Sequence, residues 1–529
     1  MPRSFDSVFY GAAGTSTGDP VDDEFNRVSF LAHMEGANNG VNNVFDDSSA
    51  SNRTVTVLGK ATQGSFGPFA RPDGEWAVAL DGNGDYLTLA ASNDFDGSDG
   101  DITWECFIFV DSLNSAGGNQ RTIFEYYDNG QLFRFITYNA VLNVFQRVSA
   151  GDFALASSDC VVLNEWAHVA VTRSSSNEYK IFHNGVLVAN ATNSIAAMNT
   201  ASLPLQIGLG QLSPGGRYFP GSISNFRITK GTLVYTSNFT PPTAPLTAIT
   251  NTKLLICQSN RFVDNSTSAH TVTPSGNAAV SAFGPFLTDE VYDPAVNGAS
   301  AYFNGAGATS LLINSPPSSF GTSNFTIEAW VYKFASSGGA IILSQGDGDA
   351  VNTRKVSSFG VGDTKVTLQV YEPTGGNRIL LQTATGTVPS KSWNHIALTH
   401  QYTNSSSSTY KIWINGVLTS TLNHTGGYNW NSGAGSGNPI GIDNYRFDGS
   451  AGAEAYMQDT RLVVGSLVYT SNFTPPTAPL TAITNTQLLL NMQDGQAIDS
   501  ATQDVLNFEG AAKISTGQAK FGDTSLYLS

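Results

Sequence analysis

Residues 233–252 read LVYTSNFTPPTAPLTAITNT, and residues 467–486 read the same twenty letters. An identity of this length, at an offset of 234 positions, identifies an internal repeat with the period of a whole domain. Its proline-rich centre at 241–245 cannot belong to a central strand, because proline lacks a backbone N–H. We therefore expect this stretch to cross the surface of one module and to lead directly into the opening strand of the next.

Weaker matches fill in the rest of the module. Residues 101–108 (DITWECFI) match residues 324–331 (NFTIEAWV), and residues 166–172 (WAHVAVT) match residues 393–399 (WNHIALT). All four segments are rich in β-branched and aromatic residues, which favour strands. In the second pair of segments both faces are largely apolar at a period of two, which indicates a central strand.

Two hairpins complete the local pattern. Asn184-Gly185 separates the runs YKIFH and VLV, and Asn415-Gly416 separates YKIWI and VL. Asn-Gly supplies the two positive φ angles of a type I′ turn, which matches the twist of paired strands. No comparably long apolar stripe of helical period stands out. The predicted fold class is therefore all-β, with short and few helices.

The repeat also predicts the domain organisation. Each copy is expected to open on an apolar strand, at 28–32, 253–257 and 487–491. The last copy has only 44 residues, 486–529, too few to close a sandwich, so we expect another chain or a longer protein to complete it. The predicted parts are an N-terminal arm at 1–26, a β-sandwich at 27–250, a second at 251–484, and the start of an incomplete third module at 485–529.

The succession D-G-x-G-D-Y-L (81–87), F-T-I-E-x-W-V (325–331), W-x-H-x-A-x-T and Y-x-I-x-x-N-G resembles a known module. This is the laminin-G-like, concanavalin A-like lectin/glucanase module that is repeated in virion proteins of tailed phages, notably marine ones. The resemblance covers roughly residues 27–529. It implies tandem antiparallel β-sandwiches of the jelly-roll type. It does not specify a function, because this fold hosts lectins, glycosidases and inert spacers alike.

Composition excludes two classes of partner. Lys and Arg total 26 against 42 Asp and Glu, and the net charge of −16 repels phosphate backbones, so no nucleic acid is expected. No stretch approaches the roughly 20 apolar residues that span a bilayer, and residues 1–6 lack the apolar run of a secretion signal. We therefore expect no membrane insertion. Cys106, Cys160 and Cys257 have no pairing or metal-ligand spacing and are interpreted as core fillers.

The sequence does not predict an enzyme. Glucanases of this superfold place paired carboxylates on one strand at alternate positions. Glu105 and Glu328 lie on the matching strand, but neither has an acidic residue two positions away. His168 and His395 have no nucleophile or metal partner at a recognisable spacing. We interpret all four as structural, hydrogen-bonded residues.

One loop has oxygen ligands at alternate positions, as in the start of an EF-hand: Asp81, Asn83 and Asp85. The pattern then fails, because Tyr86 stands where the sharp-turn glycine belongs and Ser92 where the bidentate glutamate belongs. A plain turn is the competing interpretation. No cofactor is required, and Ca²⁺ is the ion that the resemblance implies for acidic turns. The other candidate ligands are Asp46, Asp47, Asp264 and Asp499.

A glycan site needs exposed aromatics on loops, with amides and carboxylates beside them, because a sugar stacks one face and hydrogen-bonds its rim. Two loops of the second copy and one of the first fit this description. The competing interpretation is edge packing of the rings. The candidate residues are Tyr428, Trp430, Tyr445 and Tyr218.

The N-terminal arm belongs to no repeat and is rich in glycine. We expect it to order against other virion proteins, which makes it the attachment segment. Its expected anchors are Phe5, Val8, Phe9 and Tyr10.

These expectations combine into a non-enzymatic structural protein of a phage virion, either a tail or appendage fibre or a head-decorating protein. It would sit on the particle surface as a homo-oligomer and contact host surface polysaccharide. The alternatives are a bacterial extracellular adhesin that binds carbohydrate, a glycoside hydrolase, and a spacer without a ligand.

Overall fold

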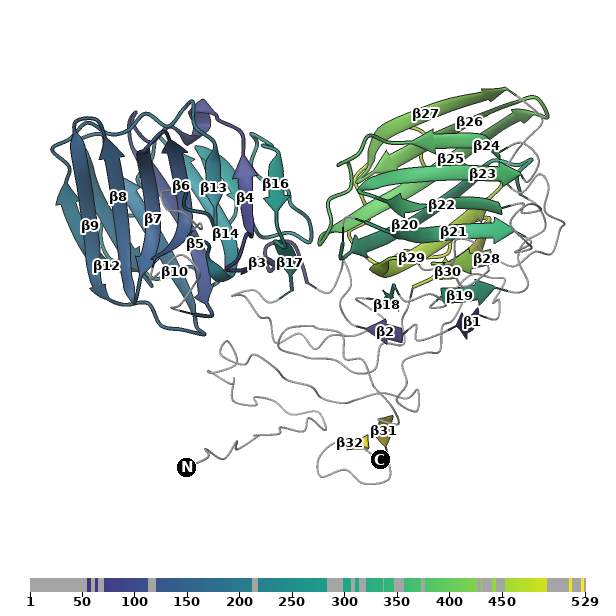
Figure 1. Ribbon diagram of the computed structural model, residues 1–529, viewed down its shortest axis with the longest axis horizontal. Coiled ribbons are helices and arrows are strands. Elements are labelled where there is room, and N and C mark those ends of the chain that lie inside the picture. The colour runs from purple at the N-terminus through teal and green to yellow at the C-terminus, as the bar shows by residue number, and fades with distance from the viewer. Residues whose placement is uncertain are drawn as a thin grey trace. The chain divides into compact units, whose positions relative to one another are not determined.

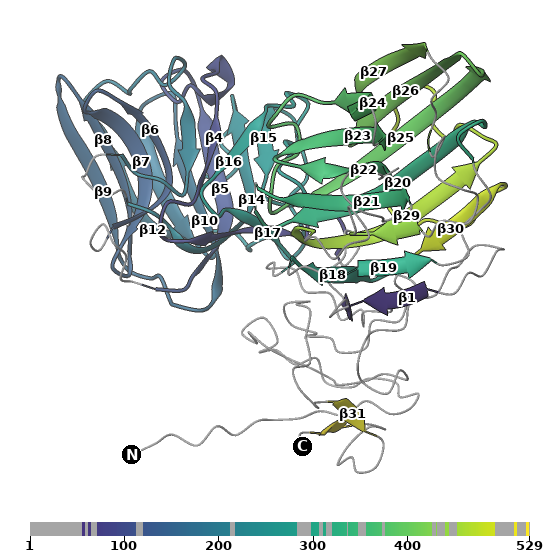
Figure 2. The same cartoon turned by 45° about the vertical axis from the view of Figure 1, so that its right-hand side comes forward.

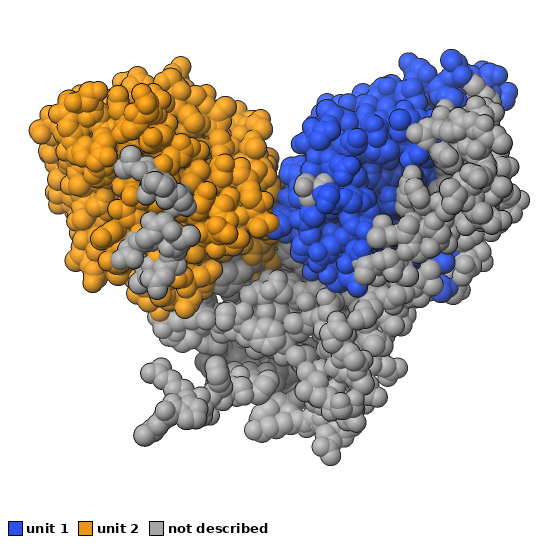
Figure 3. Space-filling model, in the orientation of Figure 1, with its two compact units in different colours: residues 1–21, 30–70, 290–529 blue, residues 22–29, 71–289 orange. Residues whose placement is uncertain are grey.

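The structure, a computed structural model, describes most of the chain in two compact units, coloured separately in Figure 3. We call residues 71–282 the first sandwich, and the strands at 55–64 together with residues 298–491 the second sandwich. No helix among the described residues is long and apolar enough to cross a membrane. The described residues are 55–58, 62–64, 71–112, 120–211, 217–282, 298–305, 310–313, 320–335, 337–346, 356–372, 376–425, 430, 440–443, 452–491, 513–515 and 525–527.

The first sandwich consists of two antiparallel sheets (Figure 1). Its strands are β3 (Ala77–Asp81), β4 (Tyr86–Leu89), β5 (Ile102–Val110), β6 (Gln120–Asp128), β7 (Gln131–Tyr138), β8 (Val141–Val148), β9 (Gly151–Asp159), β10 (Trp166–Arg173), β11 (Glu178–His183), β12 (Val186–Thr192), β13 (Leu205–Ile207), β14 (Pro220–Lys230), β15 (Thr252–Ile256), β16 (Val272–Ser275) and β17 (Ala279–Ser281), with a 3₁₀ helix, η2, at Asn93–Phe95. The eight-stranded sheet has the order β12-β11-β10-β5-β14-β3-β17, with β15 also paired to β14. The seven-stranded sheet has the order β16-β4-β13-β6-β7-β8-β9.

The second sandwich repeats this plan strand for strand. Its strands are β1 (Val55–Leu58), β2 (Thr62–Gly64), β18 (Ser300–Asn304), β19 (Ser310–Ile313), β20 (Phe325–Lys333), β21 (Gly339–Gly346), β22 (Val356–Gly362), β23 (Lys365–Glu372), β24 (Gly376–Gln382), β25 (Trp393–Asn404), β26 (Ser407–Ile414), β27 (Val417–Thr425), β28 (Ile440–Ile442), β29 (Glu454–Val464) and β30 (Thr486–Leu490). The sheets have the orders β27-β26-β25-β20-β29-β18-β2, with β30 beside β29, and β1-β19-β28-β21-β22-β23-β24. Two further strands, β31 (Lys513–Ser515) and β32 (Ser525–Tyr527), pair with each other. The predicted all-β fold of tandem antiparallel sandwiches is confirmed.

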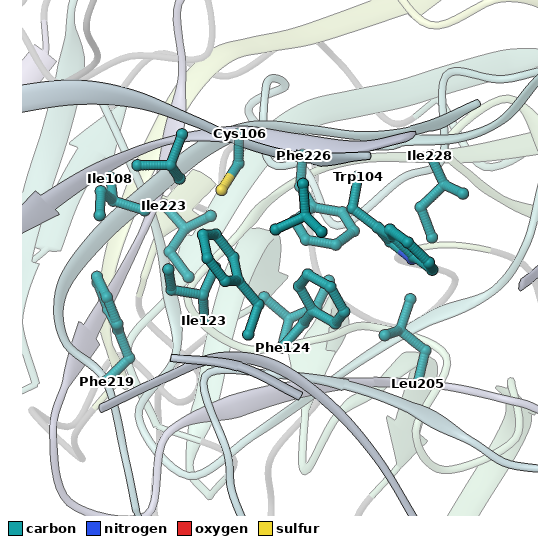
Figure 4. Packing of buried hydrophobic residues seen from close by; sticks show 14 of the residues in the cluster. Trp104, Cys106, Ile108, Ile123, Phe124, Leu205, Phe219, Ile223, Phe226 and Ile228 are labelled. Carbon is teal, nitrogen blue, oxygen red and sulfur yellow. The ribbon is translucent and has the colours of Figure 1, made fainter. Parts of the chain in front are cut away.

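Each sandwich has its own hydrophobic core between its two sheets. In the first, alternate residues of β5 point inward, and Figure 4 shows Trp104, Cys106 and Ile108 packed against Phe124 from the opposite sheet. Period-2 alternation therefore produces the core, as expected for stacked sheets. Cys106 and Cys257 belong to this core and Cys160 packs against it; all three thiols are free.

The bounds of the two sandwiches differ from the module bounds that the repeat predicts. Strand β15, expected to open the second module, pairs with β14 and places Leu254 and Ile256 in the first core. Likewise β30, expected to open a third module, pairs with β29 and places Leu488 and Leu490 in the second core. The repeated stretch therefore leads into the closing strand of the same sandwich.

We call the repeated residues 233–251 and 467–485 the straps. In the first strap, the Tyr235 and Phe239 rings stack with centroids 3.7 Å apart, and both lie edge-on to His168 on the outer face of β10. Phe239 N donates to Gly185 O at 2.8 Å, in the Asn-Gly hairpin. Gly185 has φ +75°, and a Cβ there would lie 1.9 Å from Phe239 O, so the close approach requires glycine.

A buried ionic cluster holds the strap to the sheet. Glu105, on the outer face of β5, accepts hydrogen bonds from Arg227 Nε and Nη2 at 2.9 and 2.6 Å, and from Tyr235 OH at 2.7 Å. His168 Nε2 lies 3.1 Å from the same carboxylate. Arg227 Nη1 also donates to Thr247 O of the strap at 2.8 Å. The cluster therefore joins three sheet strands to both ends of the strap.

The second sandwich contains the same cluster. Glu328 accepts from Arg461 Nε and Nη2 at 2.9 and 2.6 Å and from Tyr469 OH at 2.6 Å, and His395 Nε2 lies at 3.1 Å. Arg461 Nη1 reaches Thr481 O at 2.9 Å. The two straps, which are identical in sequence, therefore make the same contacts with their sandwiches.

We expect Glu105→Gln to destabilise the first sandwich by about 3 kcal/mol, because it leaves the buried Arg227 guanidinium without a counter-charge. Tyr235→Phe removes one hydrogen bond to the carboxylate and should cost about 2 kcal/mol. Urea unfolding of the full chain measures both. Glu328→Gln is the matched control: it should shift the transition of the second sandwich and leave that of the first in place. A Glu105→Gln transition within about 0.5 kcal/mol of wild type would contradict the structural role.

Candidate functional site

Glu105 and Glu328 are the carboxylates at the strand where glucanases of this fold hold their acidic pair. Burial acts to raise the pKa of each carboxyl, but the hydrogen bond from the neighbouring histidine and the arginine charge outweigh it and lower the pKa. Both oxygens of each group accept hydrogen bonds from the cluster beneath the strap. The predicted hydrogen bonding of these residues is confirmed.

The loop with the candidate metal ligands Asp81, Asn83 and Asp85 forms a hydrogen-bonded turn. Asp81 Oδ1 accepts from Asn83 N at 2.7 Å, and Asp85 Oδ2 accepts from Asp81 N at 2.9 Å. Asp81 and Asn83 are exposed, whereas Asp85 is buried and also accepts from Asn277 N, between β16 and β17. Burial raises the pKa of the Asp85 carboxyl. These contacts are those of the competing interpretation, a plain turn.

Of the other candidate metal ligands in acidic turns, Asp264 lies within the described residues. Asp264 is buried, and its carboxylate accepts from Leu255 N, Ser266 N and His270 N, each at 2.9 Å, so it shapes the turn after β15. Within the described part of the chain, no group of three or more His, Cys, Asp or Glu side chains could hold a metal ion. Asp46, Asp47 and Asp499 lie outside the described residues.

The predicted aromatic residues separate into two groups. The structure corrects the placement of Trp430, which is fully buried, stacks on Phe320 at 5.8 Å and donates to Gln345 Oε1 at 3.2 Å; it belongs to the second core rather than to the surface. Tyr218 is half-buried, with its ring 6.4 Å from that of Tyr86. The predicted residues Tyr428, Tyr445, Phe5, Val8, Phe9 and Tyr10 lie outside the described residues.

Next to Tyr218, the outer face of the seven-stranded sheet of the first sandwich carries a charged row that sequence analysis missed. Strand register places its members opposite one another across adjacent strands. We call this set the cross-sheet row: Thr88 on β4, Gln206 on β13, Glu125 on β6, Arg134 on β7 and Phe145 on β8. The Asn129-Gly130 turn was the available signal, because counting outward from it pairs Glu125 with Arg134.

Glu125 and two arginines dominate the electrostatics of the row. Glu125 Oε1 accepts from Gln211 N at 2.6 Å, and Oε2 lies 3.9 Å from Arg134 Nη1. Burial raises the pKa of the Glu125 carboxyl to about 7, although Gln211, Arg134 and Arg217 act to lower it. Burial and the neighbouring Arg217 charge lower the pKa of Arg134 to about 10. The site therefore holds more positive charge than its single carboxylate neutralises.

Several buried polar atoms of this site have no hydrogen-bond partner among the residues that the structure describes: Glu125 Oε2, Thr122 Oγ1, and the Nε and Nη1 atoms of Arg134 and Arg217. Buried donors without partners are rare in native proteins and indicate an ordered water or a ligand. The Arg134 and Arg147 guanidinium groups lie over the Phe145 ring, at 5.1 and 5.3 Å from its centroid. Arg147 also donates to Asp152, whereas Arg134 is placed with Nε and Nη1 without a hydrogen-bond partner in the described part of the chain.

The second sandwich lacks this chemistry at the same register positions. Its row consists of Leu312 on β19, Gly441 on β28, Ser344 on β21, Ser358 on β22 and Gln369 on β23. The two sandwiches thus share their strand order and their straps but differ on this face. A recess of about 380 Å³ lies elsewhere on the first sandwich, with Gln131 and Asn199 in its lining.

The raised pKa of Glu125 makes the first sandwich less stable as pH rises. The folded state holds this proton more tightly than the unfolded chain, so stability is greatest below pH 4.5 for this group and is lost as pH rises toward about 7. A pKa moved from 4.5 to about 7 corresponds to about 3 kcal/mol. Glu125→Gln should remove most of this slope in urea unfolding measured from pH 4.5 to 8. Glu178→Gln, a more exposed carboxylate of the same sandwich, is the control and should retain the slope.

Three comparisons relate the chain to known proteins. A family model described as "Concanavalin A-like lectin/glucanases superfamily" matches residues 81–235 and 299–467, which together make up more than half of the chain. A search of curated proteins finds no match.

Solved structures with a similar fold include domains LG4-5 of the mouse laminin alpha1 chain, at 12% identity over 77% of this chain and 94% of that one, with a TM-score of 0.26. Another is the CBM40 of the Ruminococcus gnavus IT-sialidase bound to alpha2,3 sialyllactose, at 17% identity over 27% and 86%, TM-score 0.21. A third is domain 4 of the arabinanase AbnA from Geobacillus stearothermophilus with arabinotriose, at 18% identity over 38% and 96%, TM-score 0.25. On the strength of the family match, this chain belongs to the concanavalin A-like lectin/glucanase superfamily, with two copies of its laminin-G-like module.

Proposed function

We propose that this chain is a non-enzymatic structural protein of a phage virion, and that its first sandwich contacts an acidic glycan on the host surface. The observation that carries the binding proposal is the cross-sheet row together with Arg217. There, the buried guanidinium N–H groups of Arg134 and Arg217 have no hydrogen-bond partner in the described part of the chain, and the second sandwich has Ser358 at the position that matches Arg134.

The chemistry of the row favours an anionic ligand. A guanidinium group presents its donors in a planar fork that fits a carboxylate or sulfate. The Nε and Nη1 atoms of Arg134 and Arg217 have no hydrogen-bond partner among the described residues, and the pKa of the Glu125 carboxyl is raised above its ordinary value. A sugar that carries an acidic group would supply acceptors to the arginines and a hydroxyl to Glu125. Half-buried Tyr218 and Phe145 add ring surface at the same site.

The virion assignment is supported by the resemblance of the repeated motifs to modules of tailed-phage particles. The engagement of Glu105 and Glu328 in the strap clusters supports a structural rather than a hydrolytic role. A bacterial extracellular adhesin would use the same glycan chemistry and is the alternative function.

Mass spectrometry of purified phage particles tests the location. We expect the full chain to be present in a fixed number of copies per particle, and that number distinguishes a head-decorating protein from a tail or appendage fibre. Recovery from a bacterial surface fraction, with none in particles, would establish the adhesin instead.

A glycan array probed with the full chain tests the binding site. We expect binding to acidic glycans, weakened in high salt, and a loss of roughly 10- to 100-fold for Arg217→Ala, because a hydrogen bond to a charged group is removed. Arg217→Lys keeps the charge without the fork and should be intermediate. Asn199→Ala, in the separate recess, is the control and should bind as wild type. Equal binding by the Arg217→Ala and wild-type chains would rule out this site.

A further inference from the structure

At one edge of each sandwich, the outermost strands of the two sheets come from a separate segment of the chain. In one sandwich this segment follows the other strands in sequence, and in the other it precedes them. In the first sandwich, β16 and β17 lie beside β4 and β3, and they follow the rest of the sandwich in sequence. In the second, the corresponding positions beside β19 and β18 are filled by β1 and β2, which precede the first sandwich. Figures 1 and 2 show β1 beside β19. We call β1–β2 and β16–β17 the edge pairs.

The two edge pairs are equivalent in sequence. Residues 54–61 read TVTVLGKA and residues 271–278 read TVTPSGNA, and FGPF follows at 66–69 and at 283–286. All of these matches share one offset of 217 positions, as do the bounds of the strands themselves. The edge pairs β1–β2 and β16–β17 therefore have matching sequences and strand bounds, although each pairs with a different sandwich.

The registers are equivalent too. Thr56 of β1 lies opposite Leu312, and Thr273 of β16 lies opposite Thr88, at the matching position of the other sandwich. Main-chain pairing at a sheet edge does not depend on which segment supplies the strand. The strand register alone therefore does not determine which of the two edge pairs occupies which sandwich.

Near the end of the described residues, one more strand lies at the spacing of the repeat. Lys513–Ser515 follows Ala279–Ser281 by 234 residues, the offset of the straps. Its strand, β31, pairs with β32.

The edge pair at 272–281 is additionally tied to its own sandwich. Asp94 accepts a hydrogen bond from Ser268 Oγ at 2.9 Å and lies 3.2 Å from His270 Nε2, in the segment that leads to β16. Asp85 accepts from the N–H of Asn277, between β16 and β17. These contacts fix this pair to the sandwich that precedes it.

We propose that the edge pair at 55–64 is exchanged between copies of this chain, so that β1 and β2 of one copy pair with β19 and β18 of a second copy. The partner is thus a second copy, which offers the same register and the same strand neighbours. The exchange leaves both cores unchanged, and it is the low-cost route to oligomers known as domain swapping.

Engineered disulfides across the strand register test the exchange in the full chain. Thr56→Cys and Leu312→Cys chains, in a Cys160→Ser background because Cys106 and Cys257 are buried, are mixed, unfolded, refolded together and oxidised. Directly opposite residues of an antiparallel pair lie within disulfide reach. We expect a cross-linked product of twice the chain mass that contains one chain of each kind. The Thr56→Cys/Leu312→Cys double variant should give an intrachain link together with a ladder of interchain products that grows with protein concentration.

The matched control uses the equivalent register of the first sandwich. Chains with Thr273→Cys and Thr88→Cys, mixed in the same way, should give no interchain product, and their double variant should close within one chain. The proposal is overturned if the Thr56→Cys and Leu312→Cys mixture yields no mixed dimer, or if the double variant links within single chains at every concentration. Light scattering of the wild-type chain is the independent measurement: a mass that stays at one chain across concentrations would also overturn it.

Discussion

The structure depends on a carboxylate buried on the outer face of each eight-stranded sheet. Glu105 and Glu328 would be costly to bury alone, and each is compensated by an arginine, a tyrosine and a histidine. The tyrosine belongs to the strap, and the arginine also donates to a strap carbonyl. The buried carboxylate therefore keeps these partners only while the strap lies across the sheet. The strap in turn covers the apolar outer surface of β5, where Phe107 packs against Leu246 and Leu255. Proline-rich chain without regular structure thus becomes a fixed part of each sandwich.

Duplication preserved this arrangement and left one face to diverge. The two sandwiches share strand order, strap sequence and ionic cluster, whereas the outer face of the seven-stranded sheet carries Glu125 and Arg134 in one and Ser344 and Ser358 in the other. Residues that hold the fold together are constrained by several contacts at once. The cross-sheet row lies outside the core and takes no part in the strap contacts, although Glu125 and Arg134 are buried, and it is therefore where a binding function can differ between copies.

Most of the fold could be predicted from the sequence, because its signals are local. The Asn-Gly hairpins, the β-branched strands and the repeat all act within a few residues, and the structure has them where expected. The module boundaries could not be predicted, since they depend on which distant strand β15 or β2 pairs with, and a strand pattern does not name its neighbour. Trp430 was misplaced for a related reason: a loop aromatic beside amides looks alike whether it packs inward or outward. That Glu125 lies opposite Arg134 can be seen in the sequence only by counting residues outward from the Asn129-Gly130 turn along both strands.

The position of β1 has a consequence for the order of events during synthesis. Val55 pairs with Ile313, so the ribosome must add more than 250 residues before the partner of β1 exists. At roughly 5–20 residues per second, that interval is on the order of 10–50 s, far longer than a hairpin needs to form. The first sandwich is complete by then, because its last strand, β17, ends at Ser281, ahead of β19. Closure of the second sandwich is therefore a late event that joins β1 and β2 to a domain made much later, and on a polysome a neighbouring nascent chain that has already made β1 and β2 would present the same strands during that interval.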